Sequence, residues 1–238
     1  MRAEHQQRQS GGGAGGLFCR AARHPIIAGT VCLALVSVFF LLFPRLDLAA
    51  SRLFYVGDGV FPADGNGALR QLRDLGRLVT WVAGIGSALA LIYLAATRRN
   101  LDALRKPAFL LLTLGLGPGL LVSAMKALFG RARPKNTLPF GGDSPFSPPW
   151  EIVEHCVRTC SFISGEAAAS FWLIAFAFVT PPRWRRQVAA GALAFAFVIS
   201  LNRIAFGAHF LSDVVIAWIL TLLVILALRV VMLEPERR

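Results

Sequence analysis

His209 and Asp213 stand four residues apart in "FGAHFLSDVV", a spacing that places both on one face of a helix. An aspartate in that position can accept the Nδ1 proton of the imidazole and orient the ring, which leaves Nε2 free as a nucleophile. Arg203 ends the preceding apolar run, and Gly207 can turn the chain between the two runs. A lone histidine would usually only cap a helix, but this pair beside an arginine predicts a reactive site.

Two further cations end an earlier apolar run. Lys126 and Arg133 stand seven residues apart in "KALFGRARP", which is two helical turns, and Pro134 marks the end of the helix. Taken alone, this pair is explained equally well by side chains that extend to the membrane–water interface.

The third polar cluster is the stretch "SFISGEAAAS", which opens another apolar run. Ser161 or Ser164 can cap a helix there, and the helix dipole favours an acid such as Glu166 in the first turn by ~0.3–1 kcal/mol. The stretch therefore supplies a helix start, whose free amides bind anions, and one carboxyl group.

Phosphoryl transfer is the chemistry that these clusters fit. The three cations and the amides at Ser164 and Gly165 suit a multiply charged oxyanion, and phosphate is the obvious candidate. His209 can attack phosphorus while the cations stabilise charge on the oxygens, and a proton donor must serve the leaving oxygen. The chain has no clustered set of carboxylates or histidines for a metal, so we expect neither a metal nor another cofactor.

The elements that must position these residues are membrane helices. Hydrophobic residues make up 55% of the 238 residues and charged residues only 16%, against about 25% charged in soluble domains. Six apolar stretches follow one another, most of them close to the ~20 residues that cross a bilayer. They cover residues 26–44, 75–97, 107–129, 164–180, 187–206 and 209–233, of which the fourth is the shortest. We predict an all-α bundle of six transmembrane helices, the first an uncleaved anchor and not a signal peptide.

An even number of spans brings the basic segments to one side. The segments 98–106 and 181–186 and both tails then face the cytoplasm, because lysine and arginine favour that side. The net charge of +12 therefore indicates membrane orientation and not nucleic-acid binding. We expect a disordered basic tail at 1–25, a membrane domain at 26–233 and a second tail at 234–238. All three polar clusters then meet at the outer face.

Cys156 and Cys160 share the segment "EHCVRTC", which this topology also places outside. An oxidising compartment favours a disulfide between them, and two unpaired thiols are the alternative. A zinc site that uses His155 is disfavoured, since no second cysteine–histidine pair completes four ligands.

At these positions the chain resembles the type-2 phosphatidic acid phosphatase family, which is related to bacterial acid phosphatases and vanadium haloperoxidases. The resemblance covers residues 126–213 and rests on K-x6-R-P, S-G and R-x5-H-x3-D. It implies an α-helical bundle with its site at the outer face, where His209 forms a phosphohistidine and Asp213 orients it. The residues that the resemblance assigns to phosphate binding are Lys126, Arg133, Ser164, Gly165 and Arg203.

Three positions depart from the family pattern. Ile163 replaces a proline, Asn202 replaces a serine, and Glu166 replaces the histidine that protonates the leaving group. Glu166 is therefore a general acid in place of that histidine, or it caps the helix or binds substrate. The local sequence around these motifs is similar to that of a bacterial branch of the family, which includes lipid A 4′-phosphatase-like proteins. This resemblance implies a multi-pass protein of the bacterial inner membrane whose site faces the periplasm.

The expected function is a lipid phosphatase of the bilayer. Its candidate substrates are lipid A-like molecules, phosphatidylglycerophosphate, phosphatidic acid and polyprenyl diphosphate. The long Pro-rich loop 134–160, with Phe140, Phe146 and Trp150, is where a headgroup or the interface could be contacted. A lipid phosphotransferase with the same intermediate and a non-catalytic lipid-phosphate binder are the alternatives.

Overall fold

The computed structural model describes residues 24–98, 100–156 and 159–233. The expected tails therefore lie outside the described residues, except for positions 24 and 25. Within the described ranges all regular structure is helical, and the β-type pairing is limited to an isolated bridge between Thr137 and Ser144. The prediction of an all-α protein is confirmed for this part of the chain.

Five helical segments in the described ranges are long and apolar enough to cross a membrane. They are Pro25–Leu42, Gly67–Ala96, Leu101–Asn136, Pro182–Ala205 and Leu211–Met232. The fourth expected span is shorter, Gly165–Val179, and consists of α8 (Gly165–Trp172), η4 (Leu173–Ala175) and α9 (Phe176–Val179). The membrane bundle is thus present, and the count of six spans stays a prediction.

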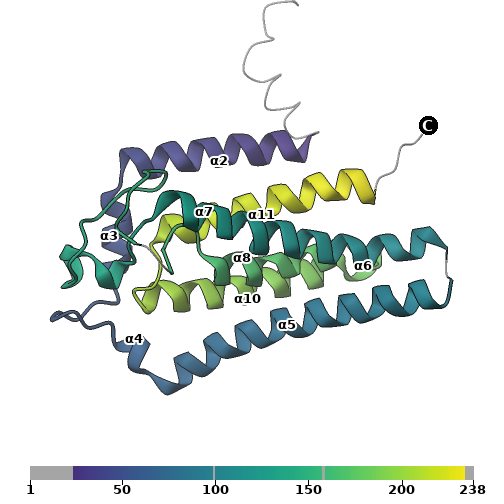
Figure 1. The fold of residues 1–238 in the computed structure, drawn as a ribbon, viewed down its shortest axis with the longest axis horizontal. Helices are drawn as coiled ribbons and strands as arrows, with labels where there is room; N and C mark the ends of the chain where they lie inside the picture. The colour runs from purple at the N-terminus through teal and green to yellow at the C-terminus, as the bar shows by residue number, and fades with distance from the viewer. Residues whose placement is uncertain (1–23, 99, 157–158, 234–238) are drawn as a thin grey trace, which may run out of the picture.

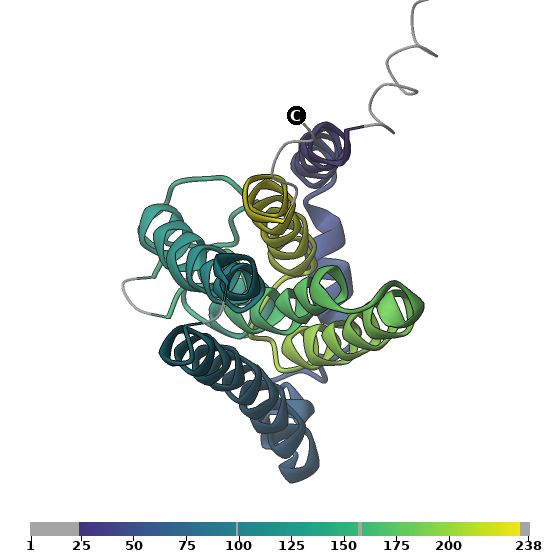
Figure 2. The same ribbon diagram turned by 90° about the vertical axis from the view of Figure 1, so that its right-hand side faces the viewer.

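The long helices run side by side, and the long loop between α7 (Val122–Phe129) and α8 lies with α3 (Arg45–Arg52) and α4 (Pro62–Gly65) at one end of the bundle (Figure 1). The long elements are α2 (Pro25–Leu42), α5 (Gly67–Ala96), α6 (Leu101–Leu114) with α7, α10 (Arg185–Ala205) and α11 (Leu211–Met232). The short helices α3 and α4 lie at the left end in Figure 1, and both ends of the described chain lie at the right. Figure 2 looks down the bundle, in which α8 packs against both α10 and α11.

One helix begins earlier than the expected span, and another span is interrupted. Helix α5 begins at Gly67, earlier than expected, because the side chain of Asn66 accepts a hydrogen bond from the Leu69 amide at 3.1 Å and caps it. The third span is interrupted by a π-helical segment, η1 (Gly115–Leu121), which contains Pro118. Proline has no amide proton to donate, and a locally widened helix accommodates it.

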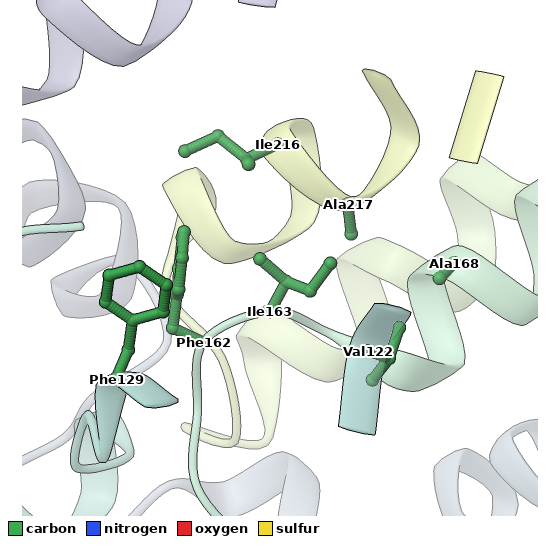
Figure 3. Packing of buried hydrophobic residues seen from close by; sticks show 7 residues of the cluster. All are labelled: Val122, Phe129, Phe162, Ile163, Ala168, Ile216 and Ala217. Atoms are coloured by element: carbon green, nitrogen blue, oxygen red, sulfur yellow. The ribbon is translucent and has the colours of Figure 1, made fainter. Parts of the chain in front are cut away.

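The path of the chain between α7 and α8 is fixed by a glycine at its start and by two buried apolar residues at its end. Gly130 ends α7 with a φ of +52°, and a Cβ there would lie 2.0 Å from the carbonyl oxygen of Val153, so only glycine fits. Further along, Phe162 and Ile163 are fully buried in a cluster with residues of α7, α8 and α11 (Figure 3). This cluster fixes the segment that leads into α8.

The aromatic side chains of loop 134–160 pack inward. Phe140 is fully buried, Phe146 packs edge-on against Phe210, and Trp150 packs against Phe129. These rings stabilise the loop against the bundle. Phe146 and Trp150 remain partly exposed, so a headgroup or interface contact by these two rings stays a prediction.

Candidate active site

Three consecutive backbone carbonyls, those of residues 159–161, hold the reactive side chains. The carbonyl of Thr159 accepts a hydrogen bond from Nε of Arg133 at 2.7 Å. Nζ of Lys126 donates to the carbonyl of Cys160, and Nδ1 of His209 lies 2.9 Å from that of Ser161. The segment before α8 thus gathers residues that the sequence placed in two separate clusters.

His209 is held in the form that a nucleophile requires. A carbonyl oxygen can only accept a hydrogen bond, so Nδ1 carries the proton in its contact with Ser161, and Nε2 keeps its lone pair. Burial lowers the pKa of His209 to about 3, the nearby Lys126 also lowers it, and Asp213 opposes the shift. The imidazole is therefore neutral at ordinary pH.

Asp213 acts on His209 through Ser161. Its Oδ2 lies 3.7 Å from Nδ1 of His209, which is longer than a hydrogen bond, so the direct contact expected from the spacing is replaced by the Ser161 carbonyl. The same Oδ2 accepts hydrogen bonds from Oγ of Ser161 at 2.5 Å and from the amide of Phe210 at 2.8 Å. Asp213 therefore fixes the residues on both sides of the imidazole.

Behind Asp213 lies Arg131, which sequence reasoning missed. Its Nη1 donates to Oδ1 of Asp213 at 2.6 Å, and its Nη2 donates to Oδ2 of Asp47 at 2.8 Å. Its Nε donates to the carbonyl of Ser147 at 2.8 Å, and its guanidinium lies 4.3 Å from the ring centroid of Phe210. Only 1% of its side chain is exposed, so this cation serves the carboxylates and not the solvent.

Asp47 comes from α3, outside every motif, and was also missed. It accepts hydrogen bonds from the amide of Ser212 at 2.8 Å and from its hydroxyl at 2.5 Å. Burial raises the pKa of Asp47, and the guanidinium of Arg131 opposes that shift. A lone acid at the end of the first apolar run is the available sequence signal, but nothing local pairs it with Arg131.

Arg203 reaches the site from the end of α10. Its Nε forms an ion pair with Oε2 of Glu166 at 2.6 Å. Its Nη1 is buried and has no hydrogen-bond partner among the residues that the structure describes. Since a buried donor without a partner is costly, this atom is suited to a ligand oxygen.

Glu166 has a second partner that sequence reasoning missed. Arg77 on α5 reaches Oε1 of Glu166 with Nε at 2.7 Å and with Nη2 at 2.5 Å. The carboxylate thus lies between two guanidinium groups, one from the motif and one from outside it. The two guanidinium groups thus fix the position of the carboxylate from two sides.

Ser164 and Gly165 open α8 beside these groups. Oγ of Ser164 accepts from the amide of Ala167 at 3.4 Å as the N-cap, and its own amide donates to the carbonyl of Asp213 at 3.1 Å. A Cβ at Gly165 would lie 3.3 Å from a methyl group of Val122, a tight approach between α8 and α7. The helix start is therefore fixed next to the histidine.

A disulfide bond joins Cys156 and Cys160 just before the carbonyl row. Because Thr159 and Cys160 supply the carbonyls that hold Arg133 and Lys126, the bond restrains the segment that places both cations.

A membrane bundle that presents a neutral, oriented histidine to three cations at one end defines a class of enzymes that act on phosphoryl groups. Residues 106–236 match the model of the PAP2 superfamily. The lipid A 4′-phosphatase of Rhizobium leguminosarum is 35% identical over 211 residues, which cover 82% of this chain and 90% of that protein. The lipid A 4′-phosphatase of Francisella tularensis subsp. novicida is 34% identical over 198 residues, covering 82% and 89%.

The chain belongs to the PAP2 superfamily and is a phosphoric ester hydrolase. Its fold is also that of a solved structure, the PAP2 type phosphatidylglycerolphosphate phosphatase of Bacillus subtilis. The TM-score is 0.58 at 17% identity, with 89% of this chain and 98% of that chain covered.

Proposed function

We propose that this protein hydrolyses the phosphate monoester of a lipid A-type glycolipid through a phosphohistidine, at the periplasmic face of a bacterial inner membrane. The observation that carries the proposal is the row of carbonyls that presents His209, with a free Nε2, to Lys126 and Arg133. The relatives named lipid A 4′-phosphatase support the choice of substrate.

In the first step, Nε2 of His209 attacks phosphorus and the bond to the sugar oxygen breaks. Lys126, Arg133 and Arg203 take the phosphoryl oxygens, together with the amides at the start of α8. Asp213 and the Ser161 carbonyl stabilise the charge that develops on the imidazole. Water then attacks the phosphohistidine, which releases inorganic phosphate and restores the neutral ring.

The leaving sugar oxygen needs a proton, and Glu166 is its donor in this proposal. In the ligand-free arrangement Glu166 forms two ion pairs, with Arg77 and with Arg203. Once phosphoryl oxygens bind Arg203, the carboxylate loses one counter-ion and faces an anion. It then accepts the proton of the phosphate monoanion and passes it to the leaving oxygen, so no outside acid is consumed.

An apolar groove of about 340 Å³ opens beside Glu166 and supports a lipid substrate. Helices α5, α6, α8 and α10 and the π-helical segment form its walls, and its charged lining residues are Arg73, Arg77 and Glu166. Among its apolar lining residues are Gly76, Trp81, Leu114, Pro118, Ala169 and Ile199. We assign an acyl chain of the substrate to this groove, because it leads from the bilayer-facing helices to the phosphoryl site.

The test is release of inorganic phosphate by the purified protein in detergent. Lipid A, phosphatidylglycerophosphate, phosphatidic acid and polyprenyl diphosphate form the panel, and lipid A is expected to give the highest kcat/KM. His209→Ala should abolish release and the alkali-stable phosphoprotein, whereas His24→Ala, at the far end of the bundle, should match the wild type. In isotopically labelled water, the released phosphate should carry the labelled oxygen. This result would exclude transfer of the phosphoryl group to another lipid. Wild-type turnover by His209→Ala would refute the mechanism.

A further inference from the structure

The carboxylate of Glu166 poses an electrostatic difficulty for a site that binds phosphate. It lies 2.6 Å from Nε of Arg203, the cation with a buried donor available to a ligand. A phosphoryl group that binds Arg203 therefore comes close to the negative charge of Glu166. Two like charges at such close range repel each other, so an uncompensated Glu166 would weaken phosphate binding.

Arg77 is placed to remove this difficulty. It binds Oε1 of Glu166 through two nitrogens, at 2.7 and 2.5 Å, while Arg203 approaches the other oxygen. Two nitrogens on one oxygen fix the direction from which the guanidinium approaches. Because Arg77 uses the oxygen that Arg203 does not, a phosphoryl group can take Arg203 and leave the Arg77 pair intact.

The position of Arg77 in the fold fits this task. It lies on α5, while Glu166 lies in the first turn of α8 and Arg203 in the last turn of α10, so the three charges join three helices. About half of the Arg77 side chain is exposed, compared with 19% for Glu166 and 6% for Arg203. Arg77 thus closes the outer side of the pair, next to the groove.

We propose that Arg77 is a positioning residue that offsets the charge of Glu166 and holds this carboxylate beside the phosphoryl site after substrate has taken Arg203. The proposal rests on the proposed function of this site as a phosphatase. It assigns two effects to one residue. The charge offset governs phosphate affinity, and the fixed carboxylate governs turnover of substrates whose leaving oxygen needs a proton.

The charge offset is tested by inhibition with inorganic phosphate, with p-nitrophenyl phosphate as the reporter substrate. Arg77→Gln should raise the inhibition constant about tenfold, because an unpaired carboxylate then repels phosphate. Glu166→Gln in the same chain should return the constant to within about threefold of the wild type, since no charge is left to offset. Arg77→Lys, which keeps the charge, should stay within about threefold as well.

The matched control is Arg70→Gln. Arg70 lies on the same helix and the same end, and its Nε donates to the carbonyl of Asp64 at 2.6 Å and not to Glu166. It should leave the inhibition constant unchanged. Thermal midpoints of all variants in detergent separate folding defects from site effects.

Turnover supplies the second readout. Arg77→Gln should lower kcat about tenfold on the lipid phosphate and less than threefold on p-nitrophenyl phosphate, whose leaving group needs no proton. The proposal would be overturned if Arg77→Gln and Arg70→Gln changed the inhibition constant equally. It would also be overturned if the double variant of Arg77→Gln and Glu166→Gln bound phosphate more weakly than either single variant. Failure of the proposed function looks different: the wild type then releases no phosphate from any lipid, while the inhibition series is still measurable.

Discussion

Replacing Arg131 with methionine should destabilise the protein strongly. Methionine keeps an unbranched apolar stem of similar length but removes the guanidinium. Its loss leaves Asp47 and Asp213, both fully buried, without the cation that lies 2.8 and 2.6 Å from their oxygens. The Ser147 carbonyl and the Phe210 ring lose the same group.

The magnitude follows from this geometry. Removing one partner of a buried ion pair costs about 3–5 kcal/mol, because the remaining charge stays buried without compensation. Arg131 serves two such carboxylates, so we expect a loss of about 4 kcal/mol in the free energy of unfolding. Arg131→Lys should recover part of this loss, since an ammonium keeps the charge but cannot reach both carboxylates with planar paired donors.

The assay is unfolding in mixed micelles, followed by tryptophan fluorescence. The matched control is Arg105→Met, which removes an arginine whose pair with Asp102, at 3.0 Å, is exposed on both sides. An exposed pair of this kind contributes about 0–1 kcal/mol. If Arg131→Met cost no more than Arg105→Met, the view that Arg131 holds the back of the site would be wrong. Activity adds a second check, because a released Asp213 should no longer fix Ser161 against His209.

Two other predictions follow from the site. Since the folded pKa of His209, about 3, lies below its ordinary value of 6.5, the neutral ring stabilises the protein above pH 6.5, and this stabilisation is lost as the pH falls from 6.5 towards 3. Wild type should therefore lose about 2 kcal/mol more than His209→Gln between pH 7.5 and 5, and parallel curves would contradict the burial of the ring. Replacing Cys156 and Cys160 with serine should raise KM several-fold, because Thr159 and Cys160 hold Arg133 and Lys126 by their carbonyls. Cys32→Ser, at an exposed thiol outside this segment, is the control, and an unchanged KM in the double variant would separate the disulfide from the cations.

Local pattern predicted much of this fold because membrane helices are local structures. Apolar runs of sufficient length predicted the helices, but the expected helix end at Pro134 was wrong, because α7 ends at Phe129 and Gly130 caps it. The runs could not reveal the amphipathic start of α5 or the π-helical segment around Pro118. Both depend on capping and on backbone hydrogen bonding, which hydropathy does not register.

For the site, too, the sequence predicted some features and not others. The spacing of Lys126 and Arg133, and of His209 and Asp213, predicted that each pair shares a helix face, and this was wrong: α7 ends at Phe129, before Arg133, and α11 begins at Leu211, after His209. It could not predict that the Ser161 carbonyl, 48 residues from His209, takes the contact expected of Asp213. A backbone carbonyl carries no sequence signal, because every residue has one.

The residues that sequence reasoning missed are all members of ion pairs between segments far apart in the chain. Arg131 pairs with Asp47 and Asp213 across 84 and 82 residues, and Arg77 pairs with Glu166 across 89. In each case one member is a charge that membrane burial makes costly, and the other is the partner that makes burial tolerable. A charged residue in a membrane protein therefore implies a partner, although the sequence does not say which one.

These pairs also divide the charge of the site into two sides. Behind His209, Arg131 holds Asp213, and in the proposed mechanism this carboxylate stabilises positive charge on the imidazole as it attacks. In front, the proposed offset of Glu166 by Arg77 would leave Lys126, Arg133 and Arg203 to face the anion. In the proposed mechanism, attack moves negative charge onto phosphoryl oxygens and positive charge onto the ring, and this charge distribution would favour both movements. The residues outside the motifs thus complete a field that the motif residues alone would leave unbalanced.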